Sequence, residues 1–109
     1  HGEATSEKNA FAHYFDGNVT CILGTHTHVP TSDNRILEKG TAYQTDVGMT
    51  GDYNSVIGMD KTNPIHGFTR GFRSEGRFTP ATGKGTICGT FIESDERTGL
   101  AKKIEPFQI

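Results

Sequence analysis

Residues 19–28, VTCILGTHTH, decide the fold, because a short apolar run meets a loop with two histidines there. Residues 19–23 have the length and composition of a buried β-strand, and Gly24 follows them directly. Upstream, residues 4–15 have the pattern of a helix, with Gly17 placed to end it. A helix, a buried strand and a glycine-containing loop in this order are typical of α/β proteins, whose functional loops follow the carboxyl ends of strands.

The flanking segments predict further elements. In the first helix, aromatic residues recur at helical spacing and predict an apolar face. Two antiparallel hairpins are expected, one from residues 35–37 and 41–45 and one from residues 86–94 and 100–104. The stretch 60–76 is ambiguous, and a short helix is one interpretation of it. The residues that would form the two apolar faces are Phe11, Tyr14 and Phe15 in the first helix and Ile65, Phe68 and Phe72 in the second.

The composition is polar for a self-sufficient domain, since 32% of the 109 residues are hydrophobic and 14 are glycine. Small chains of this kind often depend on a neighbour, a metal or an oligomer. The net charge of −2 argues against a basic nucleic-acid surface, and no apolar stretch reaches the ~20 residues of a membrane span. Because the chain begins with His1, we interpret residues 1–109 as the carboxy-terminal part of a longer protein. Cys21 and Cys88 could form one disulfide, but two buried free thiols in a reducing cytosol are favoured.

The loop after the buried strand carries the chemistry. His26 and His28 stand at i and i+2, and in extended backbone both imidazoles project to the same side and can reach one point. Neutral imidazole is the commonest metal ligand and suits Zn, Mn and Fe ions. Two polar loop histidines without a ligand are the alternative, but their place at the end of a buried strand favours a metal site.

Three stretches carry a resemblance to a known family: HGEATSEK (residues 1–8), GTHTHVPT (24–31) and GTAYQTDVGMTGDYNSVIGMD (40–60). Through them the whole chain resembles the carboxy-terminal portion of the bacterial calcineurin-like metallophosphoesterases of the YmdB type, the 2′,3′-cyclic-nucleotide phosphodiesterase family. One departure is Gly2, where the family pattern has alanine.

The resemblance implies part of a metallophosphoesterase α/β sandwich that hydrolyses cyclic nucleotides at a site with two divalent metal ions, Mn or Fe in preference to Zn. It assigns His1, His26 and His28 as metal ligands. The remaining ligands, and a histidine that protonates the leaving group, belong to the missing amino-terminal half. This chain is therefore expected to hold no catalytic residue, and to be inactive when isolated.

The loop TDVGMTG is expected to form part of the active-site wall, through Thr45, Asp46, Gly48 and Thr50. Glycine permits close approach to a phosphate there. Asp46 has three interpretations: a metal ligand, a partner that orients a ligating histidine, or a turn former. His13 is expected to be a solvated surface histidine, and His66 to be structural or solvent-facing. Arg70, Arg73, Arg77 and Lys84 form a loose basic patch, for which an ordinary solvated face is favoured over recognition of a substrate phosphate.

The expected partners are a small phosphodiester substrate, the missing half of the same protein and further copies in a homo-oligomer. No stable nucleic-acid complex is expected. The protein is expected in the cytoplasm. The rival hypotheses are a non-catalytic module whose histidines hold a structural metal, and a regulatory protein with a vestigial site. A single tightly bound, hydrolytically inert zinc would indicate the first rival, and phosphodiesterase turnover left unchanged by alanine at His26 and His28 would indicate the second.

Overall fold

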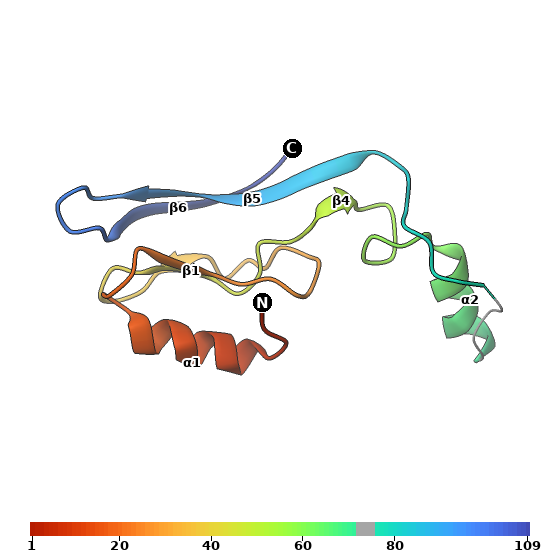
Figure 1. Cartoon of the computed structure of the whole chain (residues 1–109), viewed down its shortest axis with the longest axis horizontal. Coiled ribbons are helices and arrows are strands. Elements are labelled where there is room, and N and C mark those ends of the chain that lie inside the picture. Colours follow the sequence, from red (N-terminus) through yellow and green to blue (C-terminus); the bar gives the residue numbers. More distant parts are fainter. Residues whose placement is uncertain (72–75) are drawn as a thin grey trace.

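The computed structural model describes residues 1–71 and 76–109, which form two helices and two small sheets (Figure 1). The α/β class is confirmed, with two helices where one was expected. The elements follow the chain in the order α1 (Thr5–Phe15), β1 (Cys21–Leu23), β2 (Arg35–Ile36), β3 (Ala42–Gln44), β4 (Thr50–Asp52), α2 (Thr62–Arg70), β5 (Gly85–Ser94) and β6 (Ala101–Gln108).

The first sheet has the strand order β1-β3-β2, and α1 lies along it (Figure 1). Strand β1 runs parallel to β3, with Ile22 opposite Tyr43, while β2 and β3 form the expected antiparallel hairpin. The strand predicted at residues 19–23 forms over Cys21–Leu23, but the prediction that it is buried was wrong, because β1 is half-buried and its Leu23 is 38% exposed. The buried strand is β3, because it lies between β1 and β2 in this sheet.

The second sheet is antiparallel, with the order β4-β5-β6. Its long β5–β6 hairpin was predicted, although β6 continues beyond residue 104 to Gln108. Hydrogen bonds join the hairpin and its loop to the first sheet and the residues beside it, and one of them runs from the Thr20 hydroxyl to the Gly99 carbonyl at 2.6 Å. The Thr90 hydroxyl donates to Oε1 of Gln44 at 2.6 Å, and the Ala101 amide donates to the Gly40 carbonyl at 2.9 Å.

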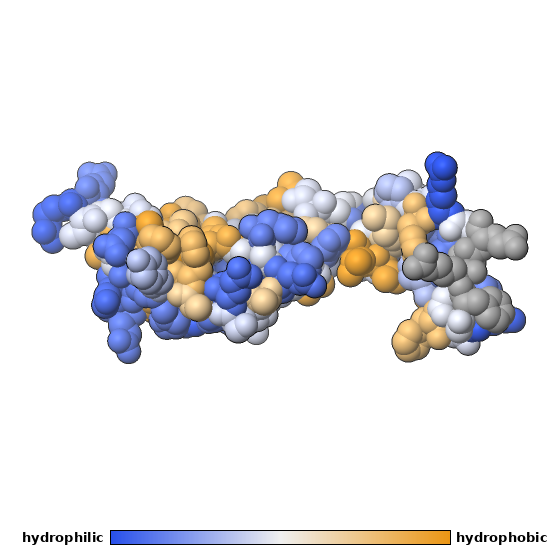
Figure 2. All heavy atoms as spheres, turned by 60° about the horizontal axis from the view of Figure 1, so that its bottom comes forward, coloured by the Kyte–Doolittle hydropathy of each residue, from blue (hydrophilic) through white to orange (hydrophobic). Residues whose placement is uncertain are grey.

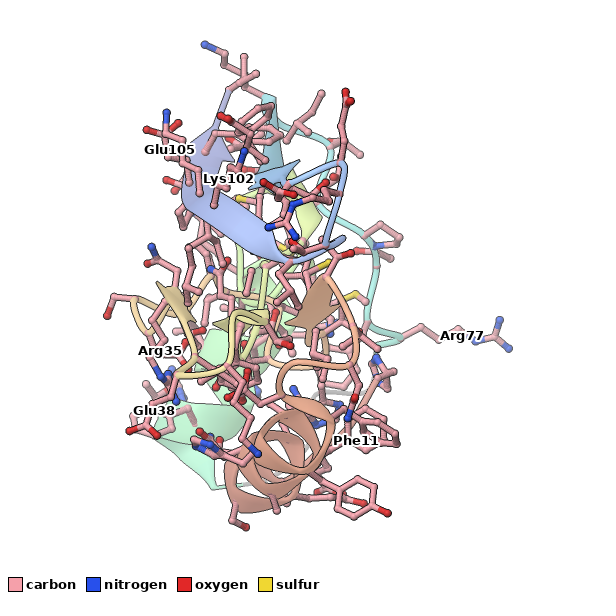
Figure 3. All side chains as sticks on the ribbon, turned by 90° about the vertical axis from the view of Figure 1, so that its left-hand side faces the viewer. Phe11, Arg35, Glu38, Arg77, Lys102 and Glu105 are labelled. Atoms are coloured by element: carbon pink, nitrogen blue, oxygen red, sulfur yellow. The ribbon has the colours of Figure 1, made fainter. Side chains whose placement is uncertain are left out.

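Helix α1 buries a different face from the predicted one. Its buried residues are Lys8 and Ala12, whereas Phe11 is 55% and Tyr14 is 79% exposed. Figure 3 shows Phe11 projecting from the helix. The strands that α1 packs on are only two or three residues long, so the sheet covers a narrow part of the helix surface. The Lys8 side chain is buried because its ammonium donates to the carbonyls of Thr25 and Thr45.

The described chain is elongated, with extents of 56 × 28 × 17 Å. Its radius of gyration is 17.3 Å, against about 13 Å for a compact chain of this length. Its accessible surface is 7576 Å², against about 6,000 Å² for a folded monomer of this mass. In Figure 2, apolar side chains come to the surface both near α1 and between the first sheet and α2. The apolar core is small, and consists of Ala12, Leu37 and Tyr43 with Ile22 against them.

Helix α2 lies at the far end of the molecule (Figure 1) and buries none of its residues Thr62–Arg70. It confirms the helical interpretation of the ambiguous stretch, although Phe72 lies outside the described residues and Phe68 is 94% exposed. Neither described helix is long and apolar enough to cross a membrane. Both cysteines are free, as predicted, but they are half-buried and not buried as expected.

Candidate metal centre

The histidine loop is anchored to the end of β3 by Gly24. Its amide donates to the Gln44 carbonyl and its carbonyl accepts from the Val47 amide, both at 3.0 Å. A Cβ atom at residue 24 would overlap the carbonyl oxygen of Thr45, so only glycine allows this approach. The loop of residues 24–28 therefore lies directly beside residues 44–47.

The backbone of the histidine loop is not extended, and the prediction that it is was wrong. His26 has φ 143° and His28 has φ 67°, because the chain turns sharply after β1 instead of continuing as a strand. Ile57, which contacts His28, has φ 49°. Among the described residues these are the non-glycine positions with positive φ, and such backbone strain clusters at functional sites.

Two of the three predicted ligands meet. His1 Nε2 lies 3.2 Å from His26 Nδ1, and the two rings stand edge to face with their centroids 5.1 Å apart. His1 Nδ1 is bonded to the Thr25 hydroxyl at 3.0 Å, which fixes the direction of its ring. Both imidazoles are exposed at the surface of the described chain.

His28 stands apart from this pair. Its Nδ1 is 2.8 Å from the carbonyl oxygen of Ile57. A carbonyl only accepts, so Nδ1 carries the proton, and in the neutral ring Nε2 then holds the lone pair that a metal needs. Within residues 1–71 and 76–109, no three His, Cys, Asp or Glu side chains gather closely enough to form a complete metal site.

Asp46 connects the histidine loop to the predicted wall. It is fully buried, and its Oδ2 accepts the Thr27 amide at 2.7 Å while its Oδ1 accepts the Gly48 amide at 2.9 Å. The Lys8 ammonium lies 3.8 Å from Oδ2. Both carboxylate oxygens are thus engaged inside the protein. The bond to Thr27 favours Asp46 as a partner of the histidine loop, and the bond to the amide two residues on favours it as a turn former as well.

The other wall residues have different surroundings. Thr45 is buried, and its hydroxyl lies between Asp33 Oδ2 at 2.6 Å and the Tyr43 hydroxyl at 2.9 Å. Burial acts to raise the pKa of the Asp33 carboxyl, but hydrogen bonds from Thr31 and Thr45 outweigh it, so this pKa is lowered. Gly48 is half-buried, and Thr50 is exposed at the start of β4.

Tyr53 supports the wall loop and was not singled out from the sequence. Its hydroxyl accepts the Met49 amide at 3.0 Å and lies 3.0 Å from the Cys88 thiol. A Cβ atom at Gly48 would lie 2.7 Å from this hydroxyl, so glycine is needed there. Burial, followed by the hydrogen bond with Cys88, raises the pKa of Tyr53.

Lys8 is the second residue near the site that sequence reasoning missed. Its ammonium donates to the carbonyls of Thr25 at 2.9 Å and Thr45 at 3.2 Å, and the residue is only 9% exposed. The available signal was its position four residues before Ala12, which places both on one helix face. A lysine on the buried face of a helix needs oxygen partners, and these are the loop carbonyls.

A groove of about 260 Å³ runs between α1 and β1 and reaches His1. It is lined by His1, Gly2, Glu7, Lys8, Phe11, Ile22, Leu23, Gly24 and Tyr43. A larger hollow of about 400 Å³, between residues 30–34 and the end of β6, lies away from the histidines. We therefore place the candidate site at the groove end that His1 occupies.

The remaining charged candidates lie elsewhere. His13 is exposed on α1, as predicted, and His66 is half-buried in α2. In the predicted basic patch, Arg70, Arg77 and Lys84 are exposed, and Figure 3 shows Arg77 pointing away from the rest of the chain. Arg73 lies outside the described residues.

Known proteins match the chain over nearly its whole length. The family model described as "YmdB-like protein" matches residues 1–107. A curated relative from Bacillus subtilis (strain 168), named 2′,3′-cyclic-nucleotide 2′-phosphodiesterase, is 53% identical over 105 residues, which cover 96% of this chain and 39% of that protein.

Two solved structures are similar in fold. A hypothetical protein from Thermus thermophilus gives a TM-score of 0.86 at 46% identity, over 98% of this chain and 41% of that one. A Mycoplasma pneumoniae protein described as a novel phosphatase gives 0.87 at 47% identity, over 98% of this chain and 38% of that one. The chain thus spans about two fifths of the length of the proteins that it matches.

Proposed function

The chain belongs to the YmdB-like family, and on this basis we propose that it is part of a metal-dependent phosphodiesterase that hydrolyses 2′,3′-cyclic nucleotides. The observation that carries the proposal is the 53% identity, across 96% of this chain, to a relative named for that activity. The activity is proposed for the whole protein, because the chain covers 39% of that relative.

We propose that His1, His26 and His28 hold divalent metal, with Mn or Fe favoured over Zn and two ions in the complete site. The donor set fits this purpose. Two imidazole nitrogens bound to one ion at 2.0–2.1 Å stand about 3.0–3.4 Å apart, and His1 Nε2 and His26 Nδ1 are separated by 3.2 Å. His28 matches a common second arrangement, in which Nδ1–H donates to a backbone carbonyl and Nε2 faces the metal.

Divalent cations at such a site polarise the phosphoryl oxygens of a phosphodiester and activate a water for attack. This chain's own residues hold the imidazoles in place. Thr25 orients the ring of His1, and Ile57 fixes the proton of His28 on Nδ1. The wall residues Gly48 and Thr50 are proposed to lie beside the substrate, while buried Thr45 and Asp46 support them from behind.

The rest of the protein is proposed to supply the remaining ligands and the acid that protonates the leaving group. It would also cover part of the accessible surface of this chain, which is 7576 Å² against about 6,000 Å² for a compact monomer of the same mass. We further propose association with copies of itself through the exposed sheet edges, and a cytoplasmic location in which Cys21 and Cys88 stay reduced.

The test is hydrolysis of 2′,3′-cyclic AMP by the whole protein, before and after metal removal with EDTA. We expect activity to disappear with EDTA and to return with Mn²⁺ or Fe²⁺. His26→Ala and His28→Ala should each lower turnover by roughly 100-fold or more, because each histidine is proposed to position a metal ion whose charge stabilises the transition state. His13→Ala is the matched control, since this histidine is exposed on α1, and it should leave turnover unchanged.

Two outcomes would favour the rival hypotheses. A protein that binds one metal ion tightly but does not hydrolyse the cyclic nucleotide is a metal-binding module with a structural site. Turnover that survives both alanine substitutions belongs to a different site, and the histidines are then vestigial.

A further inference from the structure

We propose that Lys8 and Asp46 are positioning residues that together hold the backbone of His26 in the conformation that turns its imidazole toward His1. The inference rests on the metal-dependent function proposed above, because it gives the orientation of His26 a purpose. It assigns to Lys8 a role that no sequence pattern indicated, and to Asp46 a role distinct from metal binding.

Each of the two peptide groups beside His26 is held by one member of the pair. The preceding peptide carries the Thr25 carbonyl, which accepts a hydrogen bond from Lys8 Nζ at 2.9 Å. The following peptide carries the Thr27 amide, which donates to Asp46 Oδ2 at 2.7 Å. Since the dihedral angles of a residue are set by the planes of its two flanking peptides, holding both planes fixes the backbone of His26.

The conformation of His26 needs such support. A φ of 143° is uncommon for a residue with a side chain, and it persists only where the surroundings determine it. In this conformation His26 Nδ1 lies 3.2 Å from His1 Nε2. His1 is bonded to the hydroxyl of Thr25, the same residue whose carbonyl Lys8 holds. The pair therefore sets the direction of the His26 ring, and it holds in place Thr25, whose hydroxyl is hydrogen-bonded to His1.

Burial makes the two residues act together. Lys8 is 9% exposed and Asp46 is fully buried, with the ammonium 3.8 Å from the carboxylate. Lys8 also donates to the Thr45 carbonyl, and Asp46 also accepts the Gly48 amide. Removing one charge leaves the other buried without its counter-charge, which is unfavourable. The pair thus ties the first helix, the histidine loop and the predicted wall into one unit.

The test uses the whole protein, stripped of metal and titrated with Co²⁺ alone, whose visible absorption spectrum reports ligand geometry. Lys8→Met and Asp46→Asn should each weaken Co²⁺ binding about 10- to 100-fold and alter the spectrum, as expected for partners that orient a ligand. The fold-loss of Co²⁺ affinity in the double variant should be smaller than the two single fold-losses multiplied together, because the residues act as a unit.

The matched controls are Lys102→Met and Asp95→Asn, which disrupt an ion pair of the same residue types in the β5–β6 hairpin. That pair has an Nζ–Oδ2 distance of 3.0 Å and side chains that are 55% and 29% exposed. The Asp95 carboxylate accepts the amides of Arg97 and Thr98 in its own hairpin loop, so Co²⁺ affinity and spectrum should stay as in the wild type. Unchanged controls would show that loss of a lysine–aspartate pair elsewhere in the chain does not by itself weaken Co²⁺ binding.

A purely structural role would lower the unfolding temperature of the metal-free variants but leave the Co²⁺ affinity and spectrum unchanged, and this result overturns the inference. If Lys8→Met does not fold, Asp46→Asn, which keeps the side-chain shape and one acceptor oxygen, decides alone. A wild type that binds Co²⁺ but hydrolyses no cyclic nucleotide overturns the proposed function and leaves the affinity test intact. Wild-type hydrolysis combined with unaltered Co²⁺ binding in the variants overturns only the positioning role.

Discussion

The two helices in the described part of the chain have similar lengths and very different surroundings. Helix α1 packs on the β1-β3-β2 sheet, and we call residues 5–46, which hold these four elements and the loops that join them, the helix–sheet body. Helix α2 buries none of its residues Thr62–Arg70, and we call residues 61–71 the α2 arm. In α1, the side chains of Ala12 and Lys8 are buried against the sheet, and the Lys8 ammonium donates to the carbonyl of Thr25 in the loop after β1.

The helix–sheet body is held as much by polar groups as by apolar ones. Its buried hydrophobic residues are Ala12, Leu37, Ala42 and Tyr43, and its buried polar residues are Lys8, Asp16, Thr41, Gln44, Thr45 and Asp46. A buried polar group is tolerated only when it is hydrogen-bonded, so the apolar core alone does not fix the arrangement. The site therefore sits in the part of the chain where hydrogen bonds define the backbone.

The largest expected effect is that of Gly24→Ala, set against Gly67→Ala in the α2 arm. A methyl group at Gly24 would overlap the Thr45 carbonyl, so we expect a loss above ~3 kcal/mol or failure to fold. A methyl group at Gly67 meets nothing within 4 Å, and alanine favours a helix by about 0.5–1 kcal/mol over glycine. Chemical denaturation of both variants of the whole protein measures the difference. Equal stabilities would contradict the contrast.

A second contrast compares Leu37→Ala in the body with Phe68→Ala in the arm. Leu37 is 6% exposed and packs in the core with Ala12 and Tyr43, so its truncation should cost roughly 2–5 kcal/mol. Phe68 is 94% exposed, so its truncation should change stability by less than about 0.5 kcal/mol. Thermal and urea unfolding measure both. A large loss for Phe68→Ala would mean that another part of the protein, or a second copy, covers the arm.

Local patterns were sufficient to predict the elements that form between neighbouring segments. The helix ending before Gly17, the hairpin closed at Gly40 and the long hairpin around residues 95–99 all follow from turn chemistry and periodicity. Burial could not be predicted in this way. Whether β1 or β3 is central depends on strand order, which a sequence pattern does not contain. The same holds for α1, in which Phe11 and Tyr14 stay exposed while Phe15 is half-buried.

The sequence predicts which residues could be ligands but not how their side chains are arranged. The pattern Gly24-Thr-His-Thr-His28 predicts two ligands, and the structure places one of them, His26, beside His1. The positive φ of His26 and the separate direction of His28 depend on where distant carbonyl groups and carboxylates lie. The role of Lys8 could not be predicted from the sequence, because its acceptors are the carbonyls of Thr25 and Thr45, which lie far from it along the chain.

The smallest expected effect separates the body from the arm by acid. Burial acts to raise the pKa of Asp16 in the body, but hydrogen bonds from the Lys39 and Thr41 amides outweigh it and lower this pKa. A hydrogen bond from the Thr62 amide lowers the pKa of Asp60, the residue directly before the α2 arm, whose carboxylate holds the first turn of α2. A carboxyl group with a lowered folded pKa stabilises the protein above its ordinary pKa of 3.8, and this contribution disappears as the pH falls through the folded value.

We therefore expect the unfolding temperature of the whole protein to fall as the pH is lowered from about 5 toward 2, as for other proteins with hydrogen-bonded carboxylates. Asp16→Asn should reduce the slope of this fall, because Asp16 holds the β2–β3 turn in the body through the Lys39 and Thr41 amides. Asp60→Asn should leave the slope almost unchanged, because the arm packs on so little that its local unfolding adds little to the global transition. If Asp60→Asn flattened the profile as much as Asp16→Asn, the arm would unfold together with the body, and the distinction between a hydrogen-bonded body and an independent arm would fail.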